Sequence, residues 1–412
     1  MDPSSGGPCQ GIRNSIPELE KLGVHNEVVS LDNPAAAFLG KDPFTITALG
    51  PGKSPWCFSS KLIPWLVGNL GRFDAVIVHG LWLYNGYATY KAMRHIKISS
   101  GDKTKFTGKV PKLFIMPHGM LDPYFQRTSA RKLKAVRNWA YWKIIEEKLI
   151  HAANAVLFTT ETELQLARET FTPYNPHKEI NVGYGIKAPP EFSTIIKGAF
   201  FEKFPQLKNR KYILFLSRIH DKKGVDLLIE AYAKILSDNS GADAAKMKFS
   251  TLNSGAAFPE QPFPLLVIAG PGLDTPFGEK IKAAVSGSAQ LQKHVVFTGM
   301  LAGAVKWEAF YGCEAFILPS HQENFGIAVA EALACSKPVL ISDQVNIWRE
   351  IKTDGAGIVS TDTLEGTKEI LDNWLGMTSG EKVEMSRKAK ICFENNFAIA
   401  PAAAKFLEAV RN

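Results

Sequence analysis

The sequence contains little cysteine, and its cysteines are not spaced as they are in disulfide-rich or zinc-binding folds. There are five among 412 residues, with no Cys-x-x-Cys pair and no zinc-type spacing with histidine. Secreted disulfide scaffolds and zinc modules depend on such spacing, so both classes are excluded. We therefore expect a reducing compartment for this chain.

Long hydrophobic runs are also absent from the sequence. No stretch approaches the roughly 18 apolar residues that a membrane span requires. The first residues, Met1-Asp2-Pro3-Ser4, lack the basic and then apolar pattern of a secretory signal. We expect a cytoplasmic protein without a membrane span.

The chain does carry an excess of positive charge. Its 48 Lys and Arg against 40 Asp and Glu give a formal net charge of +8. Such an excess favours anionic partners, among them nucleotide phosphates, acidic lipid surfaces and nucleic acids. The basic residues are not interleaved with an aromatic RNA-binding motif, so we expect no nucleic-acid partner.

The length and the order of apolar runs predict two α/β domains. A chain of 412 residues exceeds the roughly 250–300 at which a single core usually divides. Short β-branched runs alternate with helical patterns, which is typical of parallel sheets. The predicted strands are 74–78, 112–116 and 155–158 in the first half, then 212–216, 265–269, 295–298, 315–318 and 338–341 in the second.

The predicted domain boundary lies in the proline-containing segment 187–191, because consecutive prolines cannot continue a helix. We assign residues 1–190 to a first Rossmann-like domain and 191–395 to a second, with a surface insertion at 237–264. Residues 396–412 are predicted to form a terminal helix. Trp374 and Phe393 are expected in the core.

The first domain begins with an irregularity. Gly6-Gly7 and a helix-like stretch over 10–22 come with no strand before them. A turn from strand to helix needs its strand, so we expect the first strand to be missing or shortened. Extending the gene upstream should then reveal an in-frame apolar strand that ends near Met1.

Charged side chains follow two of the predicted strands in the second half. Arg218 and Lys223 come after 212–216, and Glu323 and Glu331 come after 315–318. In open α/β sheets, ligands bind at the edge where strands end. Cations suit a phosphate and carboxylates suit the hydroxyls of a sugar or ribose. The two groups together predict a nucleotide-sugar site.

These residues also carry a family resemblance, which extends over most of the chain. The chain resembles the GT-B glycosyltransferases of family 4, retaining enzymes that use nucleotide-sugar donors. The resemblance implies two doubly wound Rossmann-like domains with parallel sheets that face each other across a cleft, and a C-terminal helix that crosses back to the first domain. The matching segments are Gly6-Gly7, His79-Gly80-Leu81-Trp82, Pro117-His118-Gly119, Arg218 with Lys223, Gly270-Pro271-Gly272, and Glu323 with Glu331.

The resemblance implies roles for the charged residues. Arg218 and Lys223 would contact the donor diphosphate and stabilise charge on the leaving group. Glu323 and the backbone amides of residues 324–327 (Asn324, Phe325, Gly326 and Ile327) would meet the donor sugar and phosphate. Glu331 would accept hydrogen bonds from the ribose. His118 would lie near the reacting carbon and position the sugar.

Further contacts to the donor are implied by glycines. Gly6 and Gly7 would bring backbone amides to the diphosphate from the first domain. Gly270 and the backbone of Met300 would border the nucleobase, with UDP as the first choice and GDP and ADP open. No Asp-x-Asp occurs, so we expect no metal and no other cofactor.

The predicted function is therefore sugar transfer from a nucleotide-diphosphate donor to a glycan or lipid-linked acceptor, in cell-envelope polysaccharide assembly. Two alternatives share the donor site. A nucleotide-sugar epimerase of the same fold would need acid and base carboxylates from the first domain, and the sequence offers no convincing candidates. A noncatalytic nucleotide-sugar-binding protein would not require Glu323 and Glu331 to be retained.

Residues 127–148 read as a basic amphipathic helix. Arg131, Lys132, Lys134, Arg137, Lys143 and Lys148 alternate there with Leu133, Val136, Trp139, Trp142 and Ile145. One interpretation places this face on an anionic membrane, at the inner membrane surface. We prefer the other, in which the tryptophans pack into the first domain and the lysines face water.

Overall fold

The computed structural model describes residues 1–3, 6–101, 108–128, 132–240 and 263–412, and the chain folds into two compact units. Unit 1 comprises Met1–Lys187 together with Ala398–Asn412, and unit 2 comprises Ala188–Phe397. The chain therefore leaves unit 1 in the segment 187–191 and returns to it for the last residues. The greater part of the predicted insertion at 237–264 lies outside the described residues.

Unit 1 contains two parallel sheets. β1 (Glu27–Ser30) pairs with β2 (Thr45–Ala48), and a separate four-stranded sheet has the order β3-β4-β5-β6. The second sheet consists of β3 (Ala75–His79), β4 (Lys112–Met116), β5 (Ala155–Phe158) and β6 (Glu179–Asn181). β4 and β5 are runs of apolar residues that are buried almost throughout, as expected of inner parallel strands.

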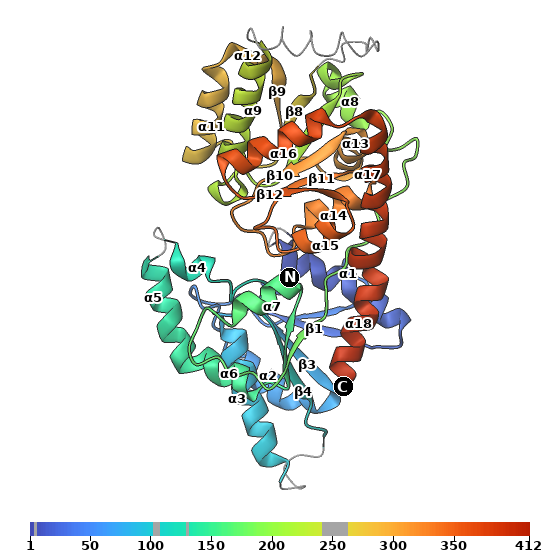
Figure 1. Ribbon diagram of the computed structural model, residues 1–412. Helices are drawn as coiled ribbons and strands as arrows, with labels where there is room; N and C mark the ends of the chain where they lie inside the picture. The colour runs from blue at the N-terminus through green and yellow to red at the C-terminus, as the bar shows by residue number, and fades with distance from the viewer. Residues whose placement is uncertain (4–5, 102–107, 129–131, 241–262) are drawn as a thin grey trace. The chain divides into compact units, whose positions relative to one another are not determined.

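Helices cover both faces of the four-stranded sheet (Figure 1). On one face, a core that includes Trp142 and Phe158 packs against α3, α6 and their neighbours. On the other face, Phe406 and Ala409 of α18 pack over Phe114 and Leu157. The helices of unit 1 are α1 (Gly7–Lys21), α2 (Leu62–Asn69), η2 (Leu70–Arg72), α3 (Tyr84–Ser99), α4 (Tyr124–Arg127), α5 (Lys132–Tyr141), η4 (Trp142–Glu146), α6 (Glu147–Ala152), α7 (Glu161–Ala167) and α18 (Ile399–Arg411).

The helix predicted over 127–148 is not one continuous α-helix. α4 ends at Arg127, residues 129–131 lie outside the described ranges, and a π-helical turn over 142–146 separates α5 from α6. The preferred burial of both tryptophans was also wrong in part. Trp142 is fully buried, whereas Trp139 is 56% exposed. The π-helical turn distorts the helix, so Trp139, three residues before the buried Trp142, lies on a neighbouring face. A regular helical period, assumed from the sequence, therefore predicted the wrong environment for Trp139.

Unit 2 has a single six-stranded parallel sheet with the order β12-β11-β10-β7-β8-β9. Its strands are β7 (Tyr212–Leu216), β8 (Leu265–Ala269), β9 (Val295–Gly299), β10 (Ala315–Leu318), β11 (Val339–Ser342) and β12 (Gly357–Ser360). The first strand, β7, lies at the centre between β8 and β10. This reversal of strand order is the switch point at which doubly wound sheets bind ligands.

The helices of unit 2 flank its sheet (Figure 1). They are α8 (Ala199–Lys203), η5 (Pro205–Leu207), η6 (Asp221–Lys223), α9 (Val225–Ser240), α11 (Pro276–Ser286), α12 (Ala289–His294), α13 (Gly303–Gly312), α14 (Ile327–Ala334), α15 (Trp348–Thr353), α16 (Leu364–Gly376), α17 (Ser379–Cys392) and η7 (Phe393–Phe397). Trp374 and Phe393 are buried, which confirms their predicted place in the core.

Candidate functional site

The two charged groups of unit 2 lie on neighbouring strands. β7 and β10 pair in parallel, with Phe316 opposite Leu214, so the loops that follow them leave the same edge of the sheet. The two loops are joined by a hydrogen bond from the backbone N–H of His321 to the carbonyl of Lys222, at 2.9 Å. The structure thus brings together two segments that lie about a hundred residues apart in sequence.

A lysine and a carboxylate meet at this junction. Lys223 donates through Nζ to Oε2 of Glu323, and both side chains are largely shielded from solvent. The loop can approach so closely because Gly224 adopts a φ of +62°, where a Cβ would lie 1.9 Å from the carbonyl oxygen of Pro319. A side chain at position 224 would therefore separate the two loops.

Glu323 is held through its backbone as well. Its N–H donates to the carbonyl of Gln344, and its carbonyl accepts from the N–H of Asn346. Three residues later, Gly326 caps α14 in the left-handed region, with φ +79° and ψ +64°. The first turn of α14 therefore begins directly beside the Glu323 carboxylate, and helix N-termini favour anionic groups.

Arg218 also follows β7 at this edge of the sheet. Its side chain is exposed, and among the residues described by the structure it makes no hydrogen bond or ion pair. The segment that carries it is nevertheless anchored, because the N–H of Ile219 donates to the carbonyl of Pro271 at 2.8 Å. Arg218 is thus a guanidinium on a fixed loop, available to an anion.

Glu331 is paired with a lysine that sequence reasoning missed. Its Oε1 accepts from Nζ of Lys306 at 2.6 Å, and both side chains are mostly buried. Burial raises the pKa of Glu331 above its usual value, and the nearby Lys306 cation opposes that shift. Lys306 lies in α13, 25 positions earlier, and carries no motif signal. Only the ion pair in the folded structure reveals it.

Gly270 and Met300, which are predicted to border the nucleobase, differ in their surroundings. Gly270 has a φ of +141°, and a Cβ there would lie 1.8 Å from the carbonyl oxygen of Ser217. This glycine therefore allows the loops after β7 and β8 to touch. Met300, which follows β9, is 72% exposed, so its backbone borders open solvent. The ring of Phe325, at the loop before α14, packs on the ring of Phe397, with centroids 5.7 Å apart.

In unit 1, His118 lies directly after β4 and is hydrogen-bonded to a second histidine. The nitrogen Nδ1 of His79 and Nε2 of His118 are 2.9 Å apart, and the rings stack at 5.2 Å. Burial lowers the pKa of His79 to about 4. Burial and then the neighbouring imidazole lower the pKa of His118 well below its usual range. Both imidazoles are therefore neutral at pH 7.

The loop that carries His118 is held by a buried carboxylate. His118 itself has a φ of +54°, an uncommon value for a residue with a side chain. Glu163 accepts from the N–H of Gly119 at 2.5 Å and from the N–H and hydroxyl of Thr159. Its spacing in α7 resembles that of any helix-surface glutamate, so nothing in the sequence pointed to Glu163.

Gly6 and Gly7 stand at the start of α1. Gly6 is the N-cap, with a φ of +88°, and no atom of the described residues lies within 4 Å of a Cβ built there. The carbonyl of Gly7 accepts from the Tyr184 hydroxyl at 2.9 Å. The helix therefore begins at Gly7, earlier than the predicted residue 10, and its first turn is open on the Gly6 side.

Among the described residues, no cluster of three or more His, Cys, Asp or Glu side chains is arranged to hold a metal ion. Within the same ranges, no helix combines the length and the apolar character that a bilayer span requires.

A family comparison covers the segment that contains the charged cluster. Residues 197–390 match the family model described as Glycosyl transferases group 1. The matched segment, somewhat less than half of the chain, is similar to this glycosyltransferase family. Arg218, Lys223, Glu323 and Glu331 all fall inside the matched segment.

Curated relatives match part of this chain. A D-inositol 3-phosphate glycosyltransferase from Geodermatophilus obscurus is 25% identical over 218 residues, which is 52% of this chain and 43% of the relative. A second enzyme of that name, from Kineococcus radiotolerans, is 24% identical over 74% of this chain and 57% of the relative. The chain thus spans about half the length of these curated relatives.

Solved structures show that the GT-B fold extends over the whole chain. A glycosyltransferase from Rickettsia africae ESF-5 superposes with a TM-score of 0.69, at 16% identity, over 98% of this chain and 96% of that one. Anabaena HepE, solved in complex with UDP and glucose, gives a TM-score of 0.64 at 14% identity, over 99% and 96% of the two chains. At these identities the likeness concerns the fold.

Proposed function

We propose that this protein transfers a sugar, with retention of anomeric configuration, from a nucleotide-diphosphate donor to a glycan or lipid-linked acceptor. One observation carries the proposal. Arg218, Lys223 and Glu323 gather where β7 and β10 end, within the segment that matches the glycosyltransferase family. A cation pair beside a carboxylate and a helix N-terminus suits a sugar diphosphate.

In the proposed mechanism, the two cations stabilise the leaving group. Breaking the bond between sugar and phosphate builds negative charge on the diphosphate, and donors aimed there lower the barrier to reaction. Arg218 is free to take this position. Lys223 would turn from Glu323 toward the phosphate or bridge the two. Because these cations would supply the charge, we propose a reaction that requires no metal ion.

The rest of the donor would be held by carboxylates and backbone. Glu323 and the amides of residues 324–327 would contact the sugar and phosphate, and Glu331 would accept from the ribose hydroxyls. Lys306 pairs with that carboxylate and orients it. Gly270 and Met300 would border the base, and Gly6 and Gly7 would add amides from unit 1. UDP is the proposed nucleotide, supported by HepE, which was solved with UDP and with UDP-glucose.

His118 would orient the sugar near its reacting carbon. Because the pKa of His118 lies well below its usual range, it would act as a neutral hydrogen-bonding group, with its tautomer set by His79. The proposed retaining step is a displacement on one face of the sugar. The bond from the anomeric carbon to the diphosphate breaks, the acceptor oxygen bonds to that carbon, and the departing phosphate oxygen takes the acceptor proton.

The proposed acceptor is presented at a membrane in the assembly of envelope polysaccharide, with the protein in the cytoplasm. The support is an apolar stripe on α5. Leu133, Val136 and Trp139 follow a spacing of three and are 89%, 67% and 56% exposed. The exposed cations Lys132, Lys134 and Arg137 border them, and α5 carries no acidic residue. An apolar stripe among cations fits an anionic bilayer surface.

The proposed donor site can be tested by thermal unfolding of the protein with UDP, GDP and ADP sugars, with and without magnesium. We expect stabilisation by one of the donors, UDP-sugars first, that does not depend on magnesium. Arg218→Ala should abolish it. Arg210→Ala, which removes an exposed arginine at the other end of β7, is the matched control and should leave the shift intact.

The outcomes separate the alternatives. If no donor shifts the unfolding of a cooperatively folded protein, the proposed donor site is wrong. Donor binding accompanied by turnover of the nucleotide sugar to its epimer, with no nucleotide released, would favour the epimerase. Donor binding without either reaction, across the acceptors tested, would favour a binding protein.

A further inference from the structure

The loop that follows His79, the last residue of β3, is fixed through its backbone. The N–H of Gly80 donates to the carbonyl of Met116 at 2.9 Å. The N–H of Leu81 donates to Sδ of Met120 at 3.1 Å. Met116 ends β4 and Met120 lies in the loop beyond it, so these two bonds join the loops that follow neighbouring strands.

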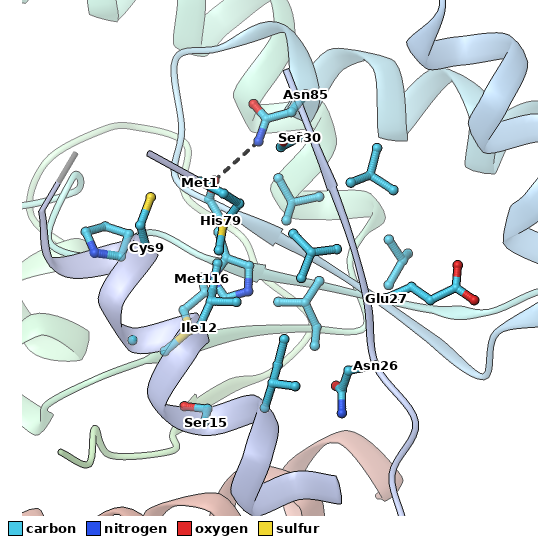
Figure 2. A pocket seen from close by; sticks show the side chains of 18 of the residues that line it. Met1, Cys9, Ile12, Ser15, Asn26, Glu27, Ser30, His79, Asn85 and Met116 are labelled. Atoms are coloured by element: carbon cyan, nitrogen blue, oxygen red, sulfur yellow. Dashed lines mark hydrogen bonds between the residues drawn. The ribbon is translucent and has the colours of Figure 1, made fainter. Parts of the chain in front are cut away.

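His79 itself is held by a side chain and by a second imidazole. Nδ2 of Asn85, in the first turn of α3, donates to the carbonyl of His79 at 3.3 Å, and Figure 2 shows this bond as a dashed line. Both residues line a cavity of about 560 Å³ that β1 and β3 also border. Nδ1 of His79 lies 2.9 Å from Nε2 of His118. The position of the His79 backbone therefore determines where its ring meets His118.

A buried carboxylate holds the far end of the same loop. The N–H of Trp82 donates to Oε1 of Glu146 at 2.7 Å. Trp82 has a φ of +71°, which a residue with a side chain rarely adopts. Such a conformation persists only where the surroundings fix it, and the bond to Glu146 is a contact that does so.

Glu146 is buried at a cost that calls for a reason. Its exposed fraction is 0%, and within the described residues its Oε2 has no hydrogen-bond partner. Glu146 ends the π-helical turn over 142–146, and such turns are frequent at functional sites. Gly86 leaves room for the carboxylate, because a Cβ there would lie 3.7 Å from Oε2 and 2.9 Å from Cδ2 of Leu149.

The loop of His118 is held in a similar way. Glu163, which is also buried, accepts from the N–H of Gly119 at 2.5 Å and from the N–H and hydroxyl of Thr159. Each of the two loops beside the paired imidazoles is therefore fixed by the carboxylate of a helix that packs nearby. Glu163 uses both of its oxygens for this purpose, whereas Glu146 uses one.

We propose that Glu146 is a positioning residue for sugar transfer. Through its bond to Trp82 it fixes the loop after β3, and it thereby holds the ring of His79 against His118. The role rests on the proposed function, in which His118 orients the donor sugar. The positioning itself can be measured without a donor. It depends on reach: a carboxamide of the same length can accept from Trp82, whereas a carboxylate that is one methylene shorter cannot.

The first test follows the imidazole proton between His79 and His118 by nitrogen-15 magnetic resonance of the full chain. His79→Gln, which removes this proton, assigns its signal. Glu146→Gln should leave its exchange with water at the parent rate, because the reach is kept. Glu146→Asp keeps the charge and loses the reach, so exchange should become at least tenfold faster. Glu147→Asp, the same change at the next and half-buried position, is the matched control and should keep the parent rate.

Trp82→Gly tests the other side of the bond. Glycine adopts the φ of residue 82 without strain and keeps the N–H, so the parent rate should persist. The proposal is overturned if Glu146→Asp keeps the parent rate, or if Glu146→Gln accelerates exchange equally. Tenfold acceleration by Trp82→Gly would overturn it too, because the indole would then hold the loop. So would unfolding of unit 1 in Glu146→Asp, because Glu146 would then support the core as a whole.

Turnover gives the second measurement, with UDP-glucose as the probe and release of UDP as the signal. In Glu146→Asp, kcat should fall at least tenfold while the KM for the donor changes little, because the groups proposed to hold the nucleotide lie mainly in unit 2. Glu146→Gln should keep the kcat of the parent. Equal kcat in Glu146→Asp and the parent would overturn the role in transfer. Failure of the parent to release UDP would count against the proposed function and not against the positioning, which the exchange rates decide alone.

Discussion

At the scale of single residues, both carboxylates of the proposed donor site are already paired with lysines. Lys223 holds Glu323, and Lys306 holds Glu331. Such pairs keep carboxylates charged in partly buried surroundings, where an unpaired charge would be costly. A ligand can then exchange partners with groups that are already oriented before it arrives.

The pairing of Glu331 can be tested by removing its partner. Lys306→Met should destabilise the fold by about 2–4 kcal/mol at pH 7, because Glu331 is left as a buried carboxylate without its cation. The double variant Lys306→Met with Glu331→Leu should recover most of that stability in urea unfolding. It should still lose donor affinity by at least tenfold in calorimetry. Normal donor binding by the double variant would rule out Glu331 as the ribose ligand.

A second residue-scale prediction concerns Glu146, which is fully buried and accepts from the backbone N–H of Trp82. Burial raises the pKa of Glu146 to about 7, and the hydrogen bond from Trp82 opposes this shift. The folded state therefore binds the proton more tightly than the unfolded chain does. The stability due to this group is complete below about pH 4.5 and declines as pH rises to about 7, by about 3 kcal/mol.

Glu146→Gln should remove the pH-dependent part of the stability that Glu146 contributes. The variant should match the parent near pH 4.5 and exceed its stability at pH 8, as measured by urea unfolding across that range. Glu147→Gln, at the neighbouring and more exposed position, is the control and should keep the slope of the parent. Parallel pH profiles for the parent and Glu146→Gln would contradict the prediction.

At the scale of elements, the sequence revealed the inner strands and missed most of the outer ones. β4, β5, β7 and β10 were predicted with their observed bounds, because buried parallel strands are continuous apolar runs. β2, β6 and β12 are edge strands of three or four residues with two or fewer large apolar side chains, and β1 borders the cavity. Their sequences do not differ from those of loops.

The sequence predicted the residues of the candidate site about as completely as it predicted the strands. The four charged residues of the candidate site follow predicted strands: Arg218, Lys223, Glu323 and Glu331. Because open α/β sheets bind ligands at the edge where their strands end, the sequence predicted that these residues lie at one edge. Lys306 and Glu163 emerged only from the structure, because each stands in an ordinary local pattern and its partner is distant in sequence. His79 belongs to a segment that carried the resemblance, but its contact with His118 emerged only from the structure. Roles for all of these residues stay predictions until the donor is bound.

The apolar stripe on α5 is predicted to contribute to binding of anionic membranes. Replacing Leu133, Val136 and Trp139 together with serine should reduce binding to anionic vesicles by at least tenfold in co-sedimentation, because their apolar surface would no longer enter the bilayer. Val383→Ser, which alters a 70% exposed apolar residue on α17, should leave binding unchanged. Salt should weaken binding of the parent protein. Equal sedimentation of the serine variant and the parent would show that α5 does not meet lipid.

At the scale of the whole molecule, the chain forms two units, and the stability of each can be measured separately. Ala409 of α18 is buried against the four-stranded sheet of unit 1, whereas Ala404 of the same helix is exposed. Ala409→Asp should lower the stability of unit 1 by about 2–5 kcal/mol, since it buries a carboxylate in an apolar core. Ala404→Asp should have little effect.

Hydrogen exchange would measure this difference. In Ala409→Asp, amides of β4 and β5 should exchange faster, while those of β7 and β10 in unit 2 keep the rates of the parent. Uniform acceleration in both units would mean that they unfold as one body.

The return of the chain to unit 1 has a consequence for biosynthesis. Unit 1 takes its segments from residues 1–187 and 398–412, whereas unit 2 is the continuous stretch 188–397. During translation at about 5–20 residues per second, the intervening stretch takes roughly 10–40 s to make. For that interval the sheet face that α18 covers, with Phe114 and Leu157, has no helix over it. The unit that begins first is therefore the last to be completed, and it needs protection from aggregation while it waits.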